Sequence, residues 1–254
     1  MSSKDSKRSG REQLAEERKA QATADKRKQT ITNTIIVVVV VAVVVGIFVA
    51  VQASRTSGPD SAALPATVTE QGGGMPFGAG PVTVDVWEDF QCPACKQFEA
   101  TNAETLKQQA QANEITLVIH PLSFLDQKLG NDSSVLAANA FGCSAASGDP
   151  SLDFHEKIYA EQPAENPGTP AWDNATLIQW ANDSGVSGSD FEACVNDGTY
   201  NDWVAQVASS GLDASINQTP TVFINGSKVD EKTLATFFTD PKALPQAISE
   251  AAQS

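Results

Sequence analysis

Two cysteines, Cys92 and Cys95, are separated by two residues in the segment "EDFQCPACKQF" (residues 88–98). A cysteine thiolate is the nucleophile of thiol–disulfide exchange, and a second cysteine one helical turn away can resolve the mixed disulfide that forms. Cys92 follows an apolar run and precedes a polar segment, so we expect it at a helix N-terminus. There, unpaired backbone N–H groups and the helix dipole lower the pKa of a thiol. Pro93 suits the first turn of such a helix.

Two other interpretations of this pair are weaker. A structural zinc site needs four ligands, usually from two such cysteine pairs. The chain has no second pair, and its two histidines, His120 and His155, lack the spacing of a zinc knuckle. A purely structural bridge across two residues restricts the unfolded chain little and therefore stabilises little. The pattern favours redox chemistry by the cysteines themselves, and we expect neither a metal nor a cofactor.

Charge is unevenly distributed along the 254 residues, whose net charge is -14. Residues 1–30 hold nine Lys or Arg against five Asp or Glu, whereas the part after residue 51 holds eight against 26. A protein that binds nucleic acid needs Lys and Arg to neutralise phosphates. The acidic body therefore argues against nucleic acid as a partner.

An apolar segment, residues 31–51, separates these two parts. It includes 17 consecutive apolar residues or glycines, and as a helix it would span about 31 Å, the thickness of a bilayer core. The positive-inside rule places the N-terminus in the cytoplasm and the body outside, because basic residues precede the segment and few follow it: Lys26, Arg27 and Lys28 against Arg55. Cleavage after Ala53, as in a signal peptide, is the alternative, but the length favours an uncleaved anchor.

All four cysteines follow the apolar segment, where disulfides can form and persist. Four cysteines allow three pairings. The spacing favours Cys92–Cys95 and Cys143–Cys194, because cysteines two residues apart at a helix start are readily bridged.

The segments around the motif predict an α/β fold. The sequence predicts a cytoplasmic tail over residues 1–30 and a linker over residues 52–64. The folded body is expected to begin near residue 65. We expect a turn-rich loop at residues 71–80, inside a hairpin that begins at "ATVT" (residues 66–69). Alternating valines predict a strand over residues 81–87. A helix over 94–113 and a strand over 114–124 follow, and such a crossover implies a parallel pair.

The remaining body combines helices with one further hairpin. Helical spacing with polar starts and glycine stops predicts a helical insertion over about residues 126–200. A helix over 201–212 precedes the strand "TPTVFING" (residues 219–226), whose Asn-Gly turn leads to a short strand. Residues 241–253 close the chain as a helix.

This order of elements, together with "FQCPAC" and "TPTVFING", resembles the thioredoxin-like DsbA family over about residues 65–254. The similarity is greatest to membrane-anchored oxidoreductases of Gram-positive and actinobacterial type. It implies that Cys92 is the nucleophile, that Cys95 resolves the mixed disulfide, and that Thr219-Pro220 is the family's cis-proline loop. That loop lies against the active-site disulfide and binds substrate peptide. The resemblance also implies that the bridge Cys143–Cys194 is structural.

The chain departs from the best-known member of the family at the dipeptide between the cysteines. Pro93-Ala94 stands where that member has Pro-His, so an imidazole that stabilises the thiolate is absent and we expect a less acidic nucleophile. Thr219 before the proline also occurs in isomerase-type relatives. The direction of electron flow therefore stays open.

The resemblance implies an extracytoplasmic thiol–disulfide oxidoreductase that introduces disulfides into secreted proteins. Its expected partners are unfolded secreted proteins with free thiols and a quinone-linked membrane re-oxidant of the DsbB or vitamin K epoxide reductase type. A reductase or isomerase of the same fold is one alternative. A non-catalytic thioredoxin-like module that binds peptides is the other.

Other residues near the motif have plainer interpretations. Glu88 and Asp89 either relay protons, or raise the thiol pKa by like-charge effects, or lie in a solvated loop. We expect His120 to be structural and His155 to lie at the surface or at a helix cap. The large aromatic residues are expected mainly in the core, namely Trp87, Phe90 and Phe223.

Overall fold

The computed structural model describes residues 62–253. The predicted tail (1–30), the apolar segment (31–51) and most of the linker (52–64) lie outside the described residues. Among the described residues, no helix is both long and apolar enough to cross a membrane.

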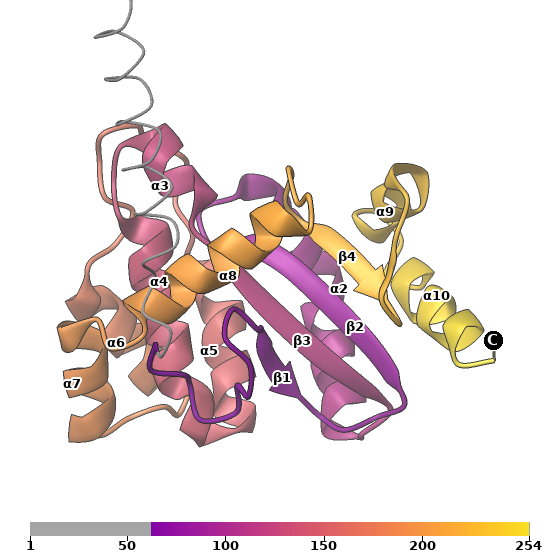
Figure 1. Cartoon of the computed structure of the whole chain (residues 1–254), viewed down its shortest axis with the longest axis horizontal. Coiled ribbons are helices and arrows are strands. Elements are labelled where there is room, and N and C mark those ends of the chain that lie inside the picture. Colours follow the sequence, from indigo (N-terminus) through magenta and orange to yellow (C-terminus); the bar gives the residue numbers. More distant parts are fainter. Residues whose placement is uncertain (1–61, 254) are drawn as a thin grey trace, which may run out of the picture. The chain divides into compact units, whose positions relative to one another are not determined.

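A five-stranded mixed sheet forms the centre of the domain, in the order β1-β3-β2-β4-β5 (Figure 1). β2 and β3 are parallel along their whole length, while β1, β4 and β5 each pair antiparallel with a neighbour. The predicted parallel pair is therefore confirmed. The strands are β1 (Met75–Phe77), β2 (Val82–Asp89), β3 (Ile115–Leu122), β4 (Thr221–Ile224) and β5 (Ser227–Lys228).

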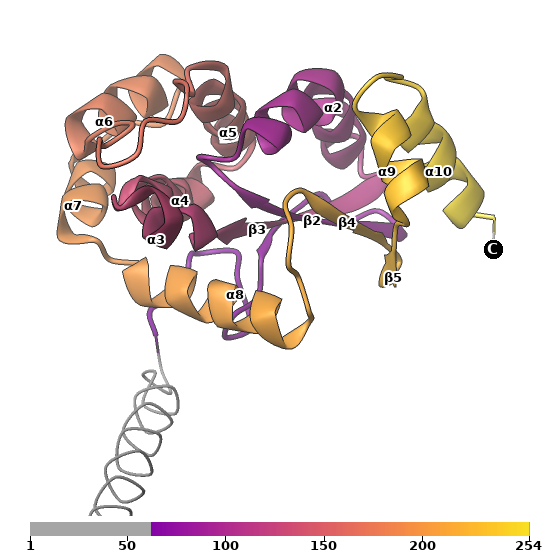
Figure 2. The same cartoon turned by 90° about the horizontal axis from the view of Figure 1, so that it is seen from above.

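Helices cover both faces of this sheet, as the edge-on view of Figure 2 shows. α8 (Asn201–Asp213) packs on one face, and α2 (Pro93–Gln111) lies on the other together with α9 (Glu231–Phe237) and α10 (Ala243–Ala251). Burying the sheet on both faces explains the valine-rich strands, since Val84 and Val86 of β2 are almost fully buried.

A helical insertion separates β3 from α8, as the sequence predicts. Its helices lie to one side of the sheet (Figure 1), where α4 contacts α6, α7 and α8. Cys143 at the end of α4 forms a disulfide with Cys194 in α7. The insertion comprises α3 (Phe124–Leu129), α4 (Ser133–Cys143), the short 3-10 helix η1 (Ser144–Ser147), α5 (Asp149–Ala160), α6 (Asn174–Asp183) and α7 (Ser189–Asp197).

The predicted hairpin before β2 is wrong. Residues 66–69 form no strand, and β1 instead lies inside the predicted loop and pairs with β3. Two glycines allow this path. Gly78 has a φ of +72°, which other residues rarely adopt. At Gly80 the chain passes so close to β3 that a Cβ atom would meet the backbone nitrogen of Ile115 at 2.2 Å.

The aromatic side chains lie mainly in the core. Phe90 is fully buried and Trp87 nearly so, as expected, whereas Phe223 on β4 is only half-buried. Phe90 contacts aromatic rings of two inserted helices, Phe141 of α4 and Tyr159 of α5. The insertion and the end of β2 therefore share one core.

Candidate active site

Cys92 is the N-cap residue of α2, as the sequence predicts, and Pro93 occupies the first turn. The loop from β2 is short, and the Cys92 backbone N–H donates to the Asp89 carbonyl oxygen at 2.8 Å. The Cys92 carbonyl in turn accepts the Lys96 N–H, which is the first hydrogen bond of the helix ladder. The strand end and helix start thus fix the position of Cys92.

This position stabilises the Cys92 thiolate. Its pKa is lowered from 9.0 to about 6, first because the Cys95 side chain donates a hydrogen bond to the Cys92 sulfur. Burial opposes the shift, and hydrogen bonds from the Thr219 side chain and from the backbone N–H groups of Cys95 and Ala94 reinforce it. Ala94 therefore contributes through its backbone.

Cys95 has the opposite character. It is fully buried, and burial raises the pKa of its thiol well above 9.0. The hydrogen bond to Cys92 and the negative charges of Cys92 and Glu88 raise it further. Both cysteines are free thiols, so the structure holds the dithiol form and not the bridged form that the spacing favours. One thiol is ready to attack while the other stays protonated.

The Thr219–Pro220 peptide bond is cis and immediately precedes β4. As a thiol, Cys92 Sγ donates to the Thr219 carbonyl oxygen at 3.5 Å. The structure therefore places the Thr219-Pro220 loop beside the nucleophile, where the family resemblance locates it.

A buried carboxyl group lies close to Cys95. Glu88, near the end of β2, is fully buried, and burial raises its pKa from 4.5 to about 8. His155 Nε2 contacts Glu88 Oε1, and His155 Nδ1 lies 3.7 Å from Oε2 of Glu99 on α2. The prediction of a surface or capping His155 is wrong, because α5 turns this histidine into the interior.

Asp89 is also buried, so the solvated-loop interpretation of Glu88 and Asp89 is wrong. Burial raises the Asp89 pKa from 3.8 to about 7. Its side chain accepts hydrogen bonds from the Ser134 hydroxyl at 2.6 Å and from the backbone N–H groups of Gln91 and Leu125 at 3.0 Å. Asp89 thus ties the active-site loop to α3 and α4.

Gln162, which follows α5, also holds this loop and was missed by the sequence analysis. Its side-chain amide donates to the carbonyl oxygens of Phe90 at 2.6 Å and Cys92 at 3.1 Å. Lys96 in turn donates to the Gln162 carbonyl at 2.7 Å. A lone glutamine after a helix carries no sequence signal, since its partners are backbone atoms distant in the chain.

His120 has the structural role that the sequence predicts. Its ring stacks on Trp87 with 3.9 Å between centroids, and its Nε2 lies 2.9 Å from Asp85 Oδ1.

The cluster of Glu88, Glu99 and His155 offers donor atoms within 4.8 Å of one another. Such groups bind divalent cations only after the carboxyls lose their protons, and burial raises the pKa of both carboxyls here. Because burial favours the protonated carboxyls, we interpret the cluster as proton-carrying groups.

Comparisons with known proteins agree with this site. A family model described as "Thioredoxin" matches residues 74–239. DsbA of Mycobacterium tuberculosis, in its oxidised form, is 26% identical over 70% of this chain and 99% of that one, with a TM-score of 0.55. MdbA, a thiol-disulfide oxidoreductase from Actinomyces oris, is 23% identical over 75% and 93%, with a TM-score of 0.62. BdbD of Bacillus subtilis is 19% identical over 76% and 100%, with a TM-score of 0.58. No curated protein sequence matches the chain.

A Cys-x-x-Cys pair at a helix start, on the fold that these oxidoreductases share, makes the protein a thiol–disulfide oxidoreductase of the DsbA and MdbA type. The family model covers more than half of the length of this chain, and the chain therefore belongs to the thioredoxin family.

Proposed function

We propose that this oxidoreductase introduces disulfides into secreted proteins through the Cys92–Cys95 pair. The asymmetry of the two thiols carries the proposal. Cys92 has a pKa of about 6, whereas the pKa of Cys95 is raised well above 9.0. A stabilised thiolate favours the reduced form, and an oxidoreductase whose reduced form is stable is a strong donor of disulfides.

The exchange proceeds in two steps. A substrate thiolate attacks Cys92 Sγ of the oxidised enzyme, the Cys92–Cys95 bond breaks, and Cys95 leaves with the electron pair and takes up a proton. A second substrate thiolate then attacks the substrate sulfur of the mixed disulfide. Cys92 leaves as a thiolate, so the substrate is oxidised and the enzyme is reduced. The low pKa of Cys92 makes it the better leaving group in this second step.

A groove beside the Thr219-Pro220 loop supports a polypeptide substrate. It has a volume of about 400 Å³ and is lined by residues on both sides of the loop, among them Gln218, Thr221 and Leu234. An extended peptide laid across this loop would bring a cysteine to Cys92, which faces the Thr219 carbonyl.

We propose further that the apolar segment, residues 31–51, anchors the enzyme with its N-terminus in the cytoplasm and its catalytic body outside. Length and flanking charge support this placement. Reduced Cys92 and Cys95 then need an electron acceptor at the same surface, and a quinone-linked membrane protein of the DsbB or vitamin K epoxide reductase type has the required chemistry.

The reduction potential tests the direction of electron flow. The full chain in detergent is equilibrated with glutathione buffers, and the state of Cys92–Cys95 is read by thiol alkylation and mass measurement of its peptide, so that Cys143–Cys194 is counted separately. We expect a potential above about -180 mV, on the side of DsbA-type oxidants. A value below about -230 mV would make the enzyme a reductase. The Cys92→Ser variant shows the background of the assay.

A further inference from the structure

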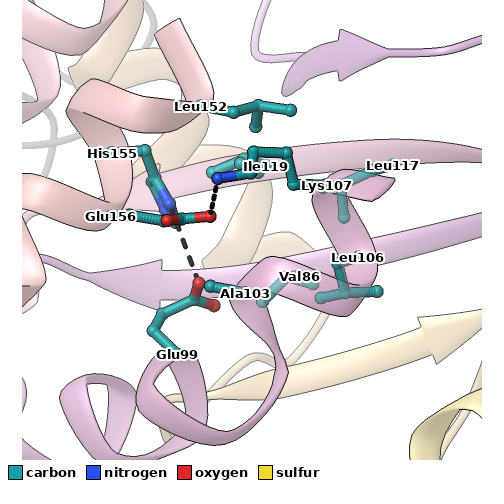
Figure 3. A pocket seen from close by; sticks show the side chains of 10 residues that line it. All are labelled: Val86, Glu99, Ala103, Leu106, Lys107, Leu117, Ile119, Leu152, His155 and Glu156. Carbon is teal, nitrogen blue, oxygen red and sulfur yellow. Dashed lines mark ion pairs between the residues drawn. The ribbon is translucent and has the colours of Figure 1, made fainter. Parts of the chain in front are cut away.

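The His155 ring lies between two carboxyl groups from different elements. Nε2 faces Glu88 of β2, and Nδ1 faces Glu99 of α2 at 3.7 Å. Figure 3 shows the His155 ring pointing towards Glu99. A neutral imidazole has one protonated and one free nitrogen, so it can accept a proton on one side and release one on the other.

Glu88, His155 and Glu99 thus form a row of three proton-carrying groups. Its inner end, Glu88, lies near Cys95. Each redox cycle requires the Cys95 sulfur to gain and lose a proton, although the residue is fully buried. Glu88 is close enough for its charge to raise the Cys95 pKa. Its second oxygen, Oε2, is buried without a well-formed hydrogen bond among the described residues, while the Tyr159 hydroxyl and the Glu99 carboxyl lie close enough to the Glu88 carboxyl to lower its pKa. That oxygen is therefore available to exchange a proton.

The outer end of the row reaches the surface between α2 and α5. Glu99 lines a small hollow together with Glu156 and Lys107, whose side chains are joined by a 3.0 Å ion pair (Figure 3). The free volume of this hollow is about 10 Å³, the room that a single water molecule needs. Glu99 and Glu156 also line an open groove of about 270 Å³ between the two helices.

We propose that His155 and Glu99 form a proton exit for Cys95 that opens in the groove between α2 and α5. The exit lies away from the helix start where Cys92 meets its substrate. Glu99 is seven residues beyond Cys92, about 10 Å along the helix axis. Protons can therefore leave or enter while a peptide covers Cys92. The inference rests on the proposed redox role of the cysteine pair.

The transfer is balanced when Cys95 resolves a mixed disulfide on Cys92. The Cys95 S–H bond breaks and its proton passes to Oε2 of the protonated Glu88 carboxyl, which at the same time gives its own proton from Oε1 to His155 Nε2. The sulfur electron pair forms the bond to Cys92, and the leaving thiolate departs with the electrons of the broken bond. His155 releases its Nδ1 proton towards Glu99 across 3.7 Å, a gap that the single water of the adjoining hollow would bridge. Glu99 takes up this proton on one carboxyl oxygen as it releases a proton from the other at the groove.

The surrounding charges suit a row that is neutral at rest. Asp89 of β2, Glu156 and Tyr159 of α5, and Cys95 and Lys107 of α2 face it. Burial raises the pKa of Glu88 and Glu99 and lowers that of His155. Burial thus favours the uncharged form of all three groups, and a concerted shift of protons leaves no net charge in the interior.

A two-phase reaction with the aromatic disulfide DTNB isolates this transfer. In the reduced full chain, Cys92 attacks the reagent in a first, bimolecular phase. Cys95 then resolves the mixed disulfide in a second phase that releases a second coloured thiolate. That thiolate needs no proton, so only the deprotonation of Cys95 depends on the exit. The His155→Gln variant is compared with His120→Gln, which removes the histidine outside the row.

We expect His155→Gln to slow the second phase at least about tenfold, to leave the first phase unchanged, and to regain rate when imidazole is added. His120→Gln should leave both phases unchanged. The exit would be overturned if a folded His155→Gln variant kept both the rate of the second phase and the dependence of that rate on pH. Equal slowing of the two phases would overturn it as well. Loss of the first phase in the wild type would instead defeat the proposed redox role. Glu99→Gln provides the same test if His155→Gln does not fold.

Discussion

The two cysteine pairs of this chain lie in contrasting surroundings. Cys143 and Cys194 join two helices of the insertion, are 51 residues apart and form a bridge. Cys92 and Cys95 share one helix start, are in the dithiol form in this structure and differ widely in pKa. A bridge over a long loop restricts the unfolded chain strongly, whereas one over two residues hardly does. Loop length and helix position thus separate a stabilising pair from a reactive one.

The sharpest test of this contrast replaces one sulfur in each pair. Cys92→Ser should reduce disulfide exchange to the uncatalysed rate, because the only stabilised thiolate of the described residues is lost. Oxidation of a reduced model protein measures this activity. Cys143→Ser should retain exchange per folded molecule. Substantial activity in Cys92→Ser would show that the pair is not the reacting one.

Removing the second pair should change stability instead of activity. The double variant Cys143→Ser/Cys194→Ser should lose about 4 kcal/mol of unfolding free energy, because the unfolded chain regains the entropy of a loop of 51 residues. For a domain of this size the melting temperature should fall by about 10 °C. A denaturant titration gives the value. A loss of unfolding free energy below about 1 kcal/mol would mean that the Cys143–Cys194 bridge is not a stabilising one.

The pH dependence of stability should differ between the dithiol and disulfide forms of Cys92–Cys95. The folded pKa of Cys92 is lowered from 9.0 to about 6, so its thiolate contributes stability that is fully present above pH 9 and is lost as the pH falls through 6. The folded pKa of Glu88 is raised from 4.5 to about 8. The stability that its neutral carboxyl contributes is therefore fully present below pH 4.5 and is lost as the pH rises through about 8.

The effect of Glu88 occurs in both forms and largely cancels in their difference. We expect the unfolding free energy of the dithiol form, relative to that of the disulfide form, to rise by a few kcal/mol between pH 6 and pH 9. Melting curves of the two forms at matched pH measure this gain. A constant difference across the range would contradict a stabilised thiolate.

Gln162→Ala should give the smallest effect. The substitution removes the hydrogen bonds that the amide donates to the Phe90 and Cys92 carbonyls, at a cost of about 1–3 kcal/mol because buried carbonyls lose a partner. Exchange should slow several-fold as the loop loosens. Gln91→Ala is the matched control, because its amide bonds Asp126, Asn131 and Ser134 and not the Cys92 carbonyl. Equal rates in the two variants would mean that Gln162 does not position Cys92.

Local chemistry determined what the sequence could predict. The helix start at Cys92, the parallel strands and the inserted helices follow from spacing, caps and hydrophobic period, which act over a few residues. The position of Thr219-Pro220 beside Cys92 came from the family resemblance.

The buried polar groups escaped prediction because their partners are distant in the chain. His155 reads as one face of an amphipathic helix, and only the packing of α5 on α2 brings it to Glu88, 67 residues away. The strand β1 escaped for a related reason, since its partner is β3 and not the next segment.

The central claim is that Cys92 is a stabilised thiolate, and its alkylation rate as a function of pH tests this most directly. The reduced full chain is treated with iodoacetamide, and modification of Cys92 is followed by mass. We predict a midpoint near pH 6, which moves towards 9 in Cys95→Ala because the largest stabilising hydrogen bond is lost. Cys95→Ser, which keeps a donor, should lie between. A wild-type midpoint near pH 9 would contradict the account.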